Sequence, residues 1–475
     1  MNKIALLKNA SALSFSRVIT ILSSMVFGIF MARYLGPGGL GQYAFIGSVL
    51  GYFIIFSNFG TLEILTREIA RNKENTNRFL LTSIIIKIGN VIISLLIISI
   101  IGFIFKQAVS IPLFIAGITL FPKCVFDSFY AVFLGHEKLK YIALSEIIHS
   151  IIQSFGGIFV LYVTHGSLVF LFIYVLFVDL LKTGIIIYFY SNRICKLKIY
   201  IPKSNEIKWL FNISKDMAVW KYSSALYESL NIIILSFTLG DYVTGEYKVA
   251  WNIISIFVTF ITIFVTVTLP ELSKLYVENK ERFIEVIKKF LDMVFISFFP
   301  IFILVILFGN IIIITLYGEQ YLNSVNYLKI LFSGVSFSLI LRILGISFII
   351  INSQRSAMYL TLIMTLLKLC TLIILGSYLN INYFCLSIVL IEVFSCILHI
   401  HFINKKIKLF NWLKDGNLVF MLFYSSLASM IFFSNQLIFI ALSSIIYLIM
   451  LSYYVRRMKI NIKDVYSIIK RNILK

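Results

Sequence analysis

Basic side chains interrupt the apolar stretches of this sequence at seven positions. They are Arg17, Lys87, Lys123, Lys182, Lys221, Arg342 and Lys368. If those stretches cross a membrane, each charge costs about 2.5–3.5 kcal/mol, so residues of this kind indicate function. Arginine binds phosphate through a planar fork that always stays charged, and lysine binds it as a point charge. The candidate substrate-binding residues are Arg17, Lys221, Lys123, Arg342 and Lys368.

Acidic residues lie in the same stretches, and two of them are spaced to neutralise a lysine. The acids include Asp127, Glu146, Asp179, Glu228, Asp292 and Glu392. Lys123 and Asp127 are four residues apart, so we expect them to pair on one helix face. Asp179 and Lys182 are three apart and are expected to do the same. Lys87 lies near a helix end, where a long side chain reaches water by snorkelling.

Two apolar segments carry a polar stripe at helical spacing. The stripe of segment 10–32 comprises Ser16, Arg17, Thr20, Ser23, Ser24 and Gly28. The stripe of segment 217–238 comprises Lys221, Ser224, Glu228 and Asn231. Two such helices would suit facing walls of a hydrated cavity, and the alternative is small-residue packing around an internal ion pair. The predicted cavity or coupling residues are Glu228, Asn231, Thr20, Ser24 and Asp127.

The composition indicates that these segments lie in a membrane. Of 475 residues, 60% are hydrophobic and 13% are charged, whereas a soluble globular protein is nearer half apolar and a quarter charged. The apolar blocks are about 20 residues long, which is the length of helix that crosses the hydrocarbon core. We predict an all-α integral membrane protein with about 14 transmembrane helices, at 10–32, 43–60, 79–105, 111–134, 142–163, 166–190, 217–238, 247–268, 287–309, 326–351, 357–379, 382–403, 416–434 and 436–455.

The distribution of basic residues supports this map. The net charge is +21, which by itself could indicate nucleic acid. However, 31 of the 42 Lys and Arg residues fall on one side of the mapped helices and four on the other. This bias is the positive-inside rule. We therefore expect no nucleic-acid partner, a multi-pass protein in contact with membrane lipids, and both termini in the cytoplasm.

One turn occurs twice in the chain. "LGPGGLGQY" at 35–43 and "LGDYVTGEY" at 239–247 both read L-G-x4-G-x-Y, six predicted helices apart. "NKE" at 72–74 and 279–281, and "GHEK" at 135–138 beside "NSQR" at 352–355, follow in the same order. An even number of helices per repeat predicts parallel repeats, a transporter architecture. We predict two six-helix lobes around a central cavity, at 1–200 and 201–405, followed at 406–475 by two further helices and a basic tail.

Cysteine and histidine spacing predicts no metal site and no cofactor. The five cysteines are scattered without a C-x-x-C, at 124, 195, 370, 385 and 396. His399 and His401 point about 200° apart on a helix, so they cannot easily share an ion.

Several longer stretches resemble bacterial polysaccharide-unit flippases. They are "MARYLGPGGLGQYA" at 31–44, "LTREIAR" at 65–71, "FLGHEKLKYIAL" at 133–144, "LGDYVTGEYKVA" at 239–250, "LPELSKLY" at 269–276 and "LYGEQYLNSVNYLKIL" at 316–331. Their order along nearly the whole chain is similar to the O-antigen/capsule flippase branch of the multidrug/oligosaccharidyl-lipid/polysaccharide exporter superfamily.

This resemblance implies two lobes forming a V, and no enzymatic activity. It implies a flippase that moves a polyprenyl-diphosphate-linked oligosaccharide from the cytoplasmic to the outer leaflet of a bacterial inner membrane, for O-antigen, lipopolysaccharide or capsule synthesis. A polysaccharide polymerase and a chain-length regulator are the implied protein partners. Coupling to H⁺ or Na⁺ stays open. Within that picture, Arg17 and Lys221 would contact the diphosphate and Glu228 would tune or couple the cycle.

Two other classes remain as alternatives. A drug/cation antiporter of the same superfamily would share the two lobes, but an acidic cluster would be expected in its first lobe, and segment 10–32 offers Arg17 and no acid. A membrane polysaccharide polymerase or an acyltransferase would usually need a sizeable outer loop or a catalytic constellation. The predicted outer segments are short, and His165 is the one histidine among them.

Overall fold

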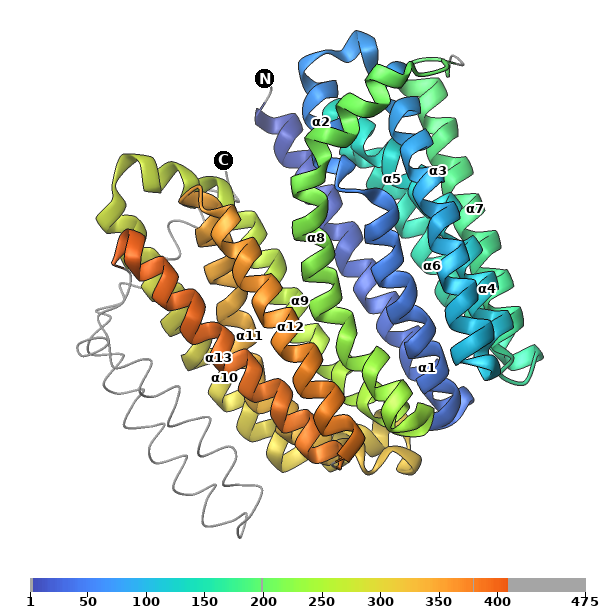
Figure 1. Ribbon diagram of the computed structural model, residues 1–475, viewed down its shortest axis with the longest axis vertical. Helices are drawn as coiled ribbons and strands as arrows, with labels where there is room; N and C mark the ends of the chain where they lie inside the picture. Colours follow the sequence, from blue (N-terminus) through green and yellow to red (C-terminus); the bar gives the residue numbers. More distant parts are fainter. Residues whose placement is uncertain (1–2, 198–199, 379, 409–475) are drawn as a thin grey trace.

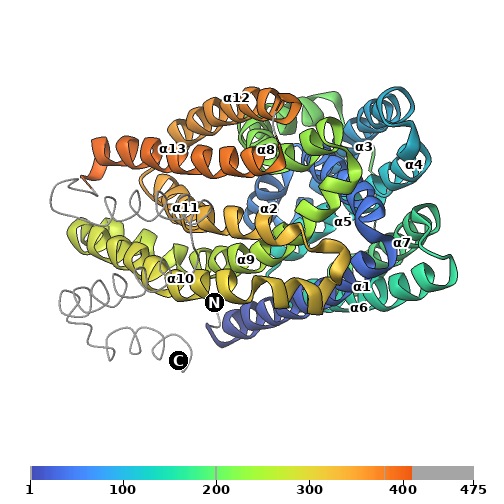
Figure 2. The same cartoon turned by 90° about the horizontal axis from the view of Figure 1, so that it is seen from below.

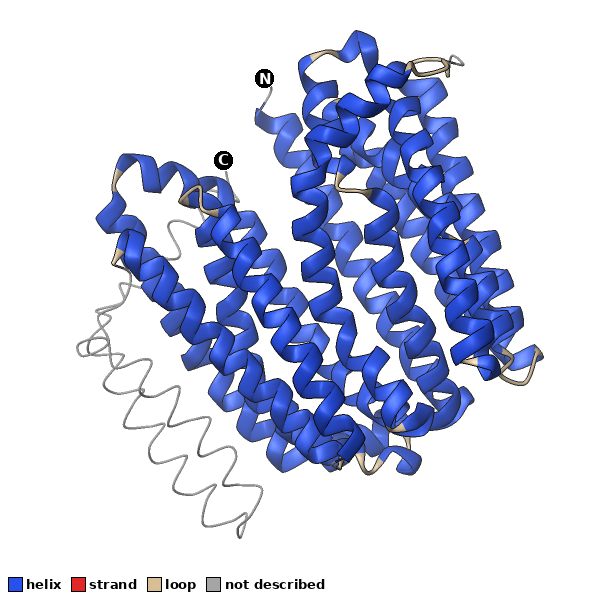
Figure 3. Cartoon of the chain, in the orientation of Figure 1, coloured by secondary structure: helices blue, strands red, loops and turns tan. Residues whose placement is uncertain are grey.

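The protein is built from helices. The computed structural model describes residues 3–197, 200–378 and 380–408, and within these ranges it contains no strand (Figures 1 and 3). The main helices are α1 Lys3–Asn58, α2 Thr61–Arg71, α3 Thr76–Ile100, α4 Ser110–Ile118, α5 Leu120–Gly135, α6 Leu139–Val163, α7 Leu168–Arg193, α8 Ser204–Thr238, α9 Gly240–Glu278, α10 Lys280–Tyr317, α11 Ser324–Ile350, α12 Gln354–Tyr378 and α13 Ile381–Ile407.

These helices confirm the predicted fold class, an all-α membrane protein. Each of the first twelve predicted spans coincides with a helix or a pair of helices. Within the described ranges, nine helical segments are both long and apolar enough to cross a membrane. The two predicted spans at 416–455 lie outside the described residues.

Three local features differ from the predicted spans. The first two spans are one long helix, α1, with a sharp kink where Gly36 takes φ 66° and ψ 177°. The fourth span is divided between α4 and α5 around Thr119, three residues before Pro122, which has no N–H to donate. Helix α2 was not predicted, because its charged sequence is too short to form a span. It buries Ile64, Leu65 and Ile69 on one face.

The helices gather into two groups, α1–α7 and α9–α13, whose ribbons diverge toward one end of the molecule, where α8 runs beside the first group (Figure 1). We call that end the basic end, made of segments 67–78, 193–197, 200–208, 274–289 and 405–408. The opposite end, where the groups converge, is called the turn end, made of segments 33–42, 106–110, 164–167, 238–241 and 318–323 and of residues 380–383. Figure 2 views the molecule from the turn end and places α8 at the boundary between the groups. The exact division at residue 200 stays a prediction.

The backbone supports the internal duplication. Gly36 and Gly240, which are equivalent in the repeated turn, both have positive φ, of 66° and 85°. Asn72 and Asn279, the first residues of the two "NKE" stretches, have nearly the same backbone angles, φ −141° and −153°. The third repeated stretch, "GHEK" and "NSQR", agrees less well. The residue with a left-handed backbone is the third of the first copy, Glu137, but the first of the second copy, Asn352.

The sidedness of the two ends can be measured directly. If the positive-inside rule holds, reporter fusions at Gly38, Asp241 and Asn380 will read as outside, because all three lie at the turn end. Matched fusions at Lys73 and Lys405, which lie at the basic end, will read as inside. A fusion that reads on the opposite side would show that the predicted topology is wrong from that position onward.

Candidate functional site

The two copies of the repeated turn contact each other. A Cβ atom added to Gly41 would overlap the carbonyl oxygen of Asp241, and one added to Gly245 would overlap the carbonyl oxygen of Pro37. Within the motif, Gly41 is equivalent to Gly245, and Pro37 to Asp241. The contact is therefore reciprocal, as in an interface with twofold symmetry. Pro37, Gly41, Asp241 and Gly245 form what we call the turn contact, which joins the two helix groups backbone to backbone.

Charged groups brace the turn contact from one side. Lys106 donates to the Asp241 carboxylate at 2.7 Å and to the Ser236 carbonyl at 2.9 Å. The Ser236 hydroxyl also donates to Asp241, at 2.6 Å. Lys106 is one of the few basic residues that the predicted topology places on the outer side. Its ion pair with Asp241 accounts for a basic residue at this position.

A second brace links α1 to the end of α10. Arg33 donates from Nε to the Leu316 carbonyl at 2.8 Å and also contacts the Thr315 carbonyl. The Tyr321 hydroxyl donates to the Ala32 carbonyl at 2.8 Å. Helix C-terminal carbonyls lack intrahelical partners, so a guanidinium satisfies them well. Both braces lie at the turn end, where the helix groups meet.

Helix α8 touches both groups closer to the basic end. Lys221 donates to Glu63 of α2 at 2.6 Å, and Phe211 stacks on Phe59 with ring centroids 4.4 Å apart. Gly60 lies so close to the backbone of α8 that a Cβ atom would come 2.8 Å from the Ala218 nitrogen. On its other side α8 packs against α12. Helix α8 thus ties α12 to the first group.

Arg17 is an exposed cation of the first helix group. Its guanidinium interacts with the Tyr130 hydroxyl of α5, and within the described ranges it forms no ion pair with a carboxylate. The neighbouring Ser16 hydroxyl donates to Glu146 of α6 at 3.3 Å. Roughly 19 residues of helix separate Arg17 from the kink at Gly36, or about 28 Å at 1.5 Å per residue. Arg17 therefore lies toward the basic end, away from the turn contact.

A buried acid, Asp179 of α7, organises the interior of the same group. Asp179 is 3% exposed, and its carboxylate lies 2.9 Å from Nε2 of His149. Its other oxygen lies 3.4 Å from the Lys123 ammonium, close enough for an ion pair but without the geometry of a hydrogen bond. Asp127 instead accepts from Asn58 at 2.5 Å. The predicted pairs within one helix, Lys123 with Asp127 and Asp179 with Lys182, are therefore wrong. Helices brought together by packing offered nearer partners than the same helix did.

The second group holds its own charged cluster. Arg342 of α11 donates to Glu228 of α8 at 2.9 Å. Lys368 of α12 is 2% exposed, donates to the Tyr227 carbonyl at 2.7 Å and sits 3.9 Å from the centre of that ring. Glu392 of α13 interacts electrostatically with both cations. Three helices thereby converge on α8.

The sequence matches a known family profile, described as polysaccharide biosynthesis protein, over residues 6–276. This match spans more than half of the chain. The chain belongs to the polysaccharide biosynthesis protein family. A curated relative, the probable low-salt glycan biosynthesis flippase Agl15 of Haloferax volcanii, is 23% identical over 384 residues, covering 79% of each chain.

Solved structures show the same fold as this family member. The lipid II flippase MurJ in an inward closed conformation has a TM-score of 0.71 at 18% identity, covering 95% of this chain and 99% of that one. A multidrug resistance MATE family transporter of the MOP superfamily, solved in an inward-facing conformation, has a TM-score of 0.69 at 15% identity. That match covers 89% of this chain and 99% of the transporter. The fold is that of the MOP superfamily transporters.

The predicted cavity residues of this family member fall into two sets. Glu228 is exposed, and so is Ser24, whose hydroxyl donates to a carbonyl of its own helix. Asn231 is only 4% exposed and donates to the Tyr247 hydroxyl at 3.1 Å. Asn231, which was predicted as a cavity or coupling residue, therefore joins α8 to α9 in this conformation. The Thr20 hydroxyl is also buried, without a hydrogen-bond partner in the part of the chain that the structure describes.

Some residues of the charged clusters were missed or misjudged. Lys87 does not snorkel but is 1% exposed, with its ammonium 3.5 Å from the Cys124 carbonyl. Lys182 lies over the Phe126 ring, 4.0 Å from its centre. His149 was not singled out, although it follows Glu146 by three residues and lies on the same helix face. The sequence gives the spacing of charged residues within each predicted helix, but it does not show which helix packs against them.

Proposed function

We propose that this protein flips a polyprenyl-diphosphate-linked oligosaccharide from the cytoplasmic to the outer leaflet by alternating access. The family supports a role in polysaccharide biosynthesis, and one curated relative bears the name of a glycan biosynthesis flippase. The fold shared with the MurJ flippase is compatible with this role. We further propose that the unit serves surface polysaccharide of the O-antigen or capsule kind in a bacterial inner membrane, with both termini in the cytoplasm.

The observation that carries the proposal is the state of Arg17. Of the five candidate cations, Lys123, Lys221 and Arg342 each face a carboxylate, and Lys368 is buried against a carbonyl. Arg17 is exposed and has no carboxylate partner among the described residues. A guanidinium without a carboxylate partner is free to bind an anion, and a diphosphate fits its fork.

The surroundings of Arg17 suit a lipid-linked anion. Phe15, Leu22 and Val26 on the same helix are also exposed, at 63%, 57% and 43%. A polyprenyl tail could remain on such apolar surface while its diphosphate contacts the guanidinium. Lys221 is committed to Glu63 at 2.6 Å in this conformation, so we assign it to holding α8 against α2 rather than to the diphosphate.

Replacement of Arg17 tests the proposal. In cells that depend on this protein for surface polysaccharide, Arg17→Ala should lower display about tenfold or more at unchanged protein level, because a hydrogen bond to a charged group contributes about 1.5–3 kcal/mol. Arg17→Lys keeps the charge and should retain part of the display. Arg355→Ala, at an exposed arginine near the basic end, is the matched control. Normal display with Arg17→Ala would remove the phosphate role, and a loss that follows protein level would show a structural role instead.

A further inference from the structure

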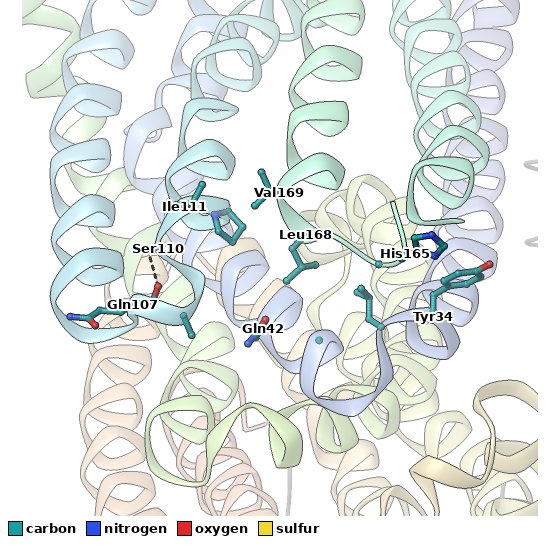
Figure 4. Close-up of a pocket in the computed structure, with 13 residues that line it drawn as sticks. Tyr34, Gln42, Gln107, Ser110, Ile111, His165, Leu168 and Val169 are labelled. Carbon is teal, nitrogen blue, oxygen red and sulfur yellow. Dashed lines mark hydrogen bonds between the residues drawn. The ribbon is translucent and has the colours of Figure 1, made fainter. Parts of the chain in front are cut away.

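A pocket of about 370 Å³ lies at the turn end of the first helix group. Three segments far apart in sequence form it: the repeated turn of α1, the start of α4, and the loop between α6 and α7 (Figure 4). Gln42 and Leu168 lie near its centre in Figure 4, with Gln107 at one edge and Tyr34 and His165 at the other. The transport proposal makes no use of this pocket.

The lining of the pocket is polar but carries no acidic residue, lysine or arginine among the described residues. It presents the amides of Gln42 and Gln107, the Ser110 hydroxyl and the His165 imidazole. Amides and hydroxyls offer both donors and acceptors, which match the hydroxyl groups of a neutral ligand. A phosphate would instead call for arginine or lysine. The chemistry therefore favours a neutral polyhydroxylated molecule over an anion.

Several of these side chains have donors and acceptors that are not used in hydrogen bonds within the protein. Within the described ranges, no side-chain hydrogen bond is made by Gln42, Gln107 or His165. His165 takes a left-handed backbone conformation, φ 51°, and Gly166 follows at φ 84°. This conformation brings the loop against the kink of α1, where a Cβ atom on Gly166 would touch Leu35. The imidazole is thus held at the rim of the pocket by the loop backbone.

An aromatic wall completes the pocket. Tyr34 is 43% exposed and packs edge-on against Tyr162, with ring centroids 6.2 Å apart. A half-exposed aromatic ring beside amide groups offers an apolar surface together with directional hydrogen bonds. A sugar ring presents the same combination, an apolar C–H face and a rim of hydroxyls.

We infer that this pocket binds the neutral saccharide part of the exported unit on the side where the unit is released. The assignment of the sugar to the exported unit rests on the proposed function, whereas the binding of a neutral saccharide does not. The pocket shares its turn with the turn contact, because Gln42 adjoins Gly41. A bound sugar therefore touches the segment that joins the two helix groups.

Saturation-transfer NMR on the full chain in detergent micelles tests this inference, with glucose, galactose and N-acetylglucosamine as probes. At least one sugar should give a signal with the unmodified protein. The double variant Tyr34→Ala, Gln107→Ala should weaken that signal about fivefold, because it removes one wall and one amide. Tyr383→Ala, Gln320→Ala is the matched control, since both residues are exposed near the turn end of the second group.

The other possible results either overturn the saccharide site or show that it stands independently of the transport proposal. Absence of any sugar signal, or equal signals from both double variants, would overturn it. Displacement of the sugar by inorganic pyrophosphate would also overturn it, because the pocket would then be an anion site. Sugar binding together with normal display by Arg17→Ala would leave the saccharide site standing while the transport proposal fails.

Discussion

Gly41→Ala should abolish transport while leaving the protein folded in the membrane. The added methyl group would overlap the carbonyl oxygen of Asp241, and backbone atoms cannot move aside as the end of a flexible side chain can. The two turns would have to separate, so the conformation joined at the turn end becomes inaccessible. Because the proposed alternating access needs both conformations, we expect surface polysaccharide display to fall to background at near-normal protein level.

The same turn supplies the control for this prediction. A Cβ atom added to Gly38 would meet no heavy atom within 4 Å, so Gly38→Ala should transport normally. Gly245→Ala should reproduce the loss, because Gly245 meets Pro37 as Gly41 meets Asp241. Normal display with both Gly41→Ala and Gly245→Ala would show that the turn contact is not needed.

A labelling measurement separates a trapped conformation from a misfolded one. Ser236 is 2% exposed beside the turn contact, so a cysteine placed there should react slowly with a membrane-impermeant maleimide. In the Gly41→Ala background the reaction should become faster, provided that Cys195 and Cys370, which are not buried, are first replaced by alanine. An unchanged labelling rate would mean that the turns remain together and that the loss of display has another cause.

Asp179→Ala should destabilise the protein strongly. Asp179 is 3% exposed and is the carboxylate that faces both Lys123 and His149. The Lys123 side chain is 30% exposed, so losing its carboxylate should cost an amount at the lower end of the about 3–5 kcal/mol for breaking a buried ion pair. Asp179→Asn keeps a hydrogen-bond acceptor for His149 but provides no charge for Lys123. The stability of this variant should therefore lie between that of Asp179→Ala and that of the native protein. Unfolding by increasing SDS in mixed micelles measures the difference.

An exposed pair provides the comparison for Asp179. Glu285 and Lys289 are 2.8 Å apart, with side chains 61% and 51% exposed. Such a surface pair contributes about 0.2–1 kcal/mol, so Glu285→Ala should leave the unfolding midpoint almost unchanged. Equal midpoints for Asp179→Ala and Glu285→Ala would mean that Asp179 does not organise the interior of the first helix group.

Features that depend on one segment at a time could be predicted from the sequence. Apolar blocks of about 20 residues identified the first twelve spans, because the thickness of the hydrocarbon core sets the length of a helix that crosses it. The repeated L-G-x4-G-x-Y turn indicated a duplication, and Gly36 and Gly240 do share positive φ. Arg17 was chosen from its place on a polar stripe, and it is indeed exposed.

Features that depend on which helices become neighbours were decided by the tertiary structure. Sequence spacing paired Lys123 with Asp127, but the packing of α5 against α7 brings Lys123 to Asp179. Asn231 belongs to the α8 stripe, yet it faces Tyr247 because α9 packs there. The repeated turns could be recognised one by one, but their reciprocal contact arises only when two helix groups fold together. Periodicity tells which side of a helix is polar, whereas only packing tells what that side meets.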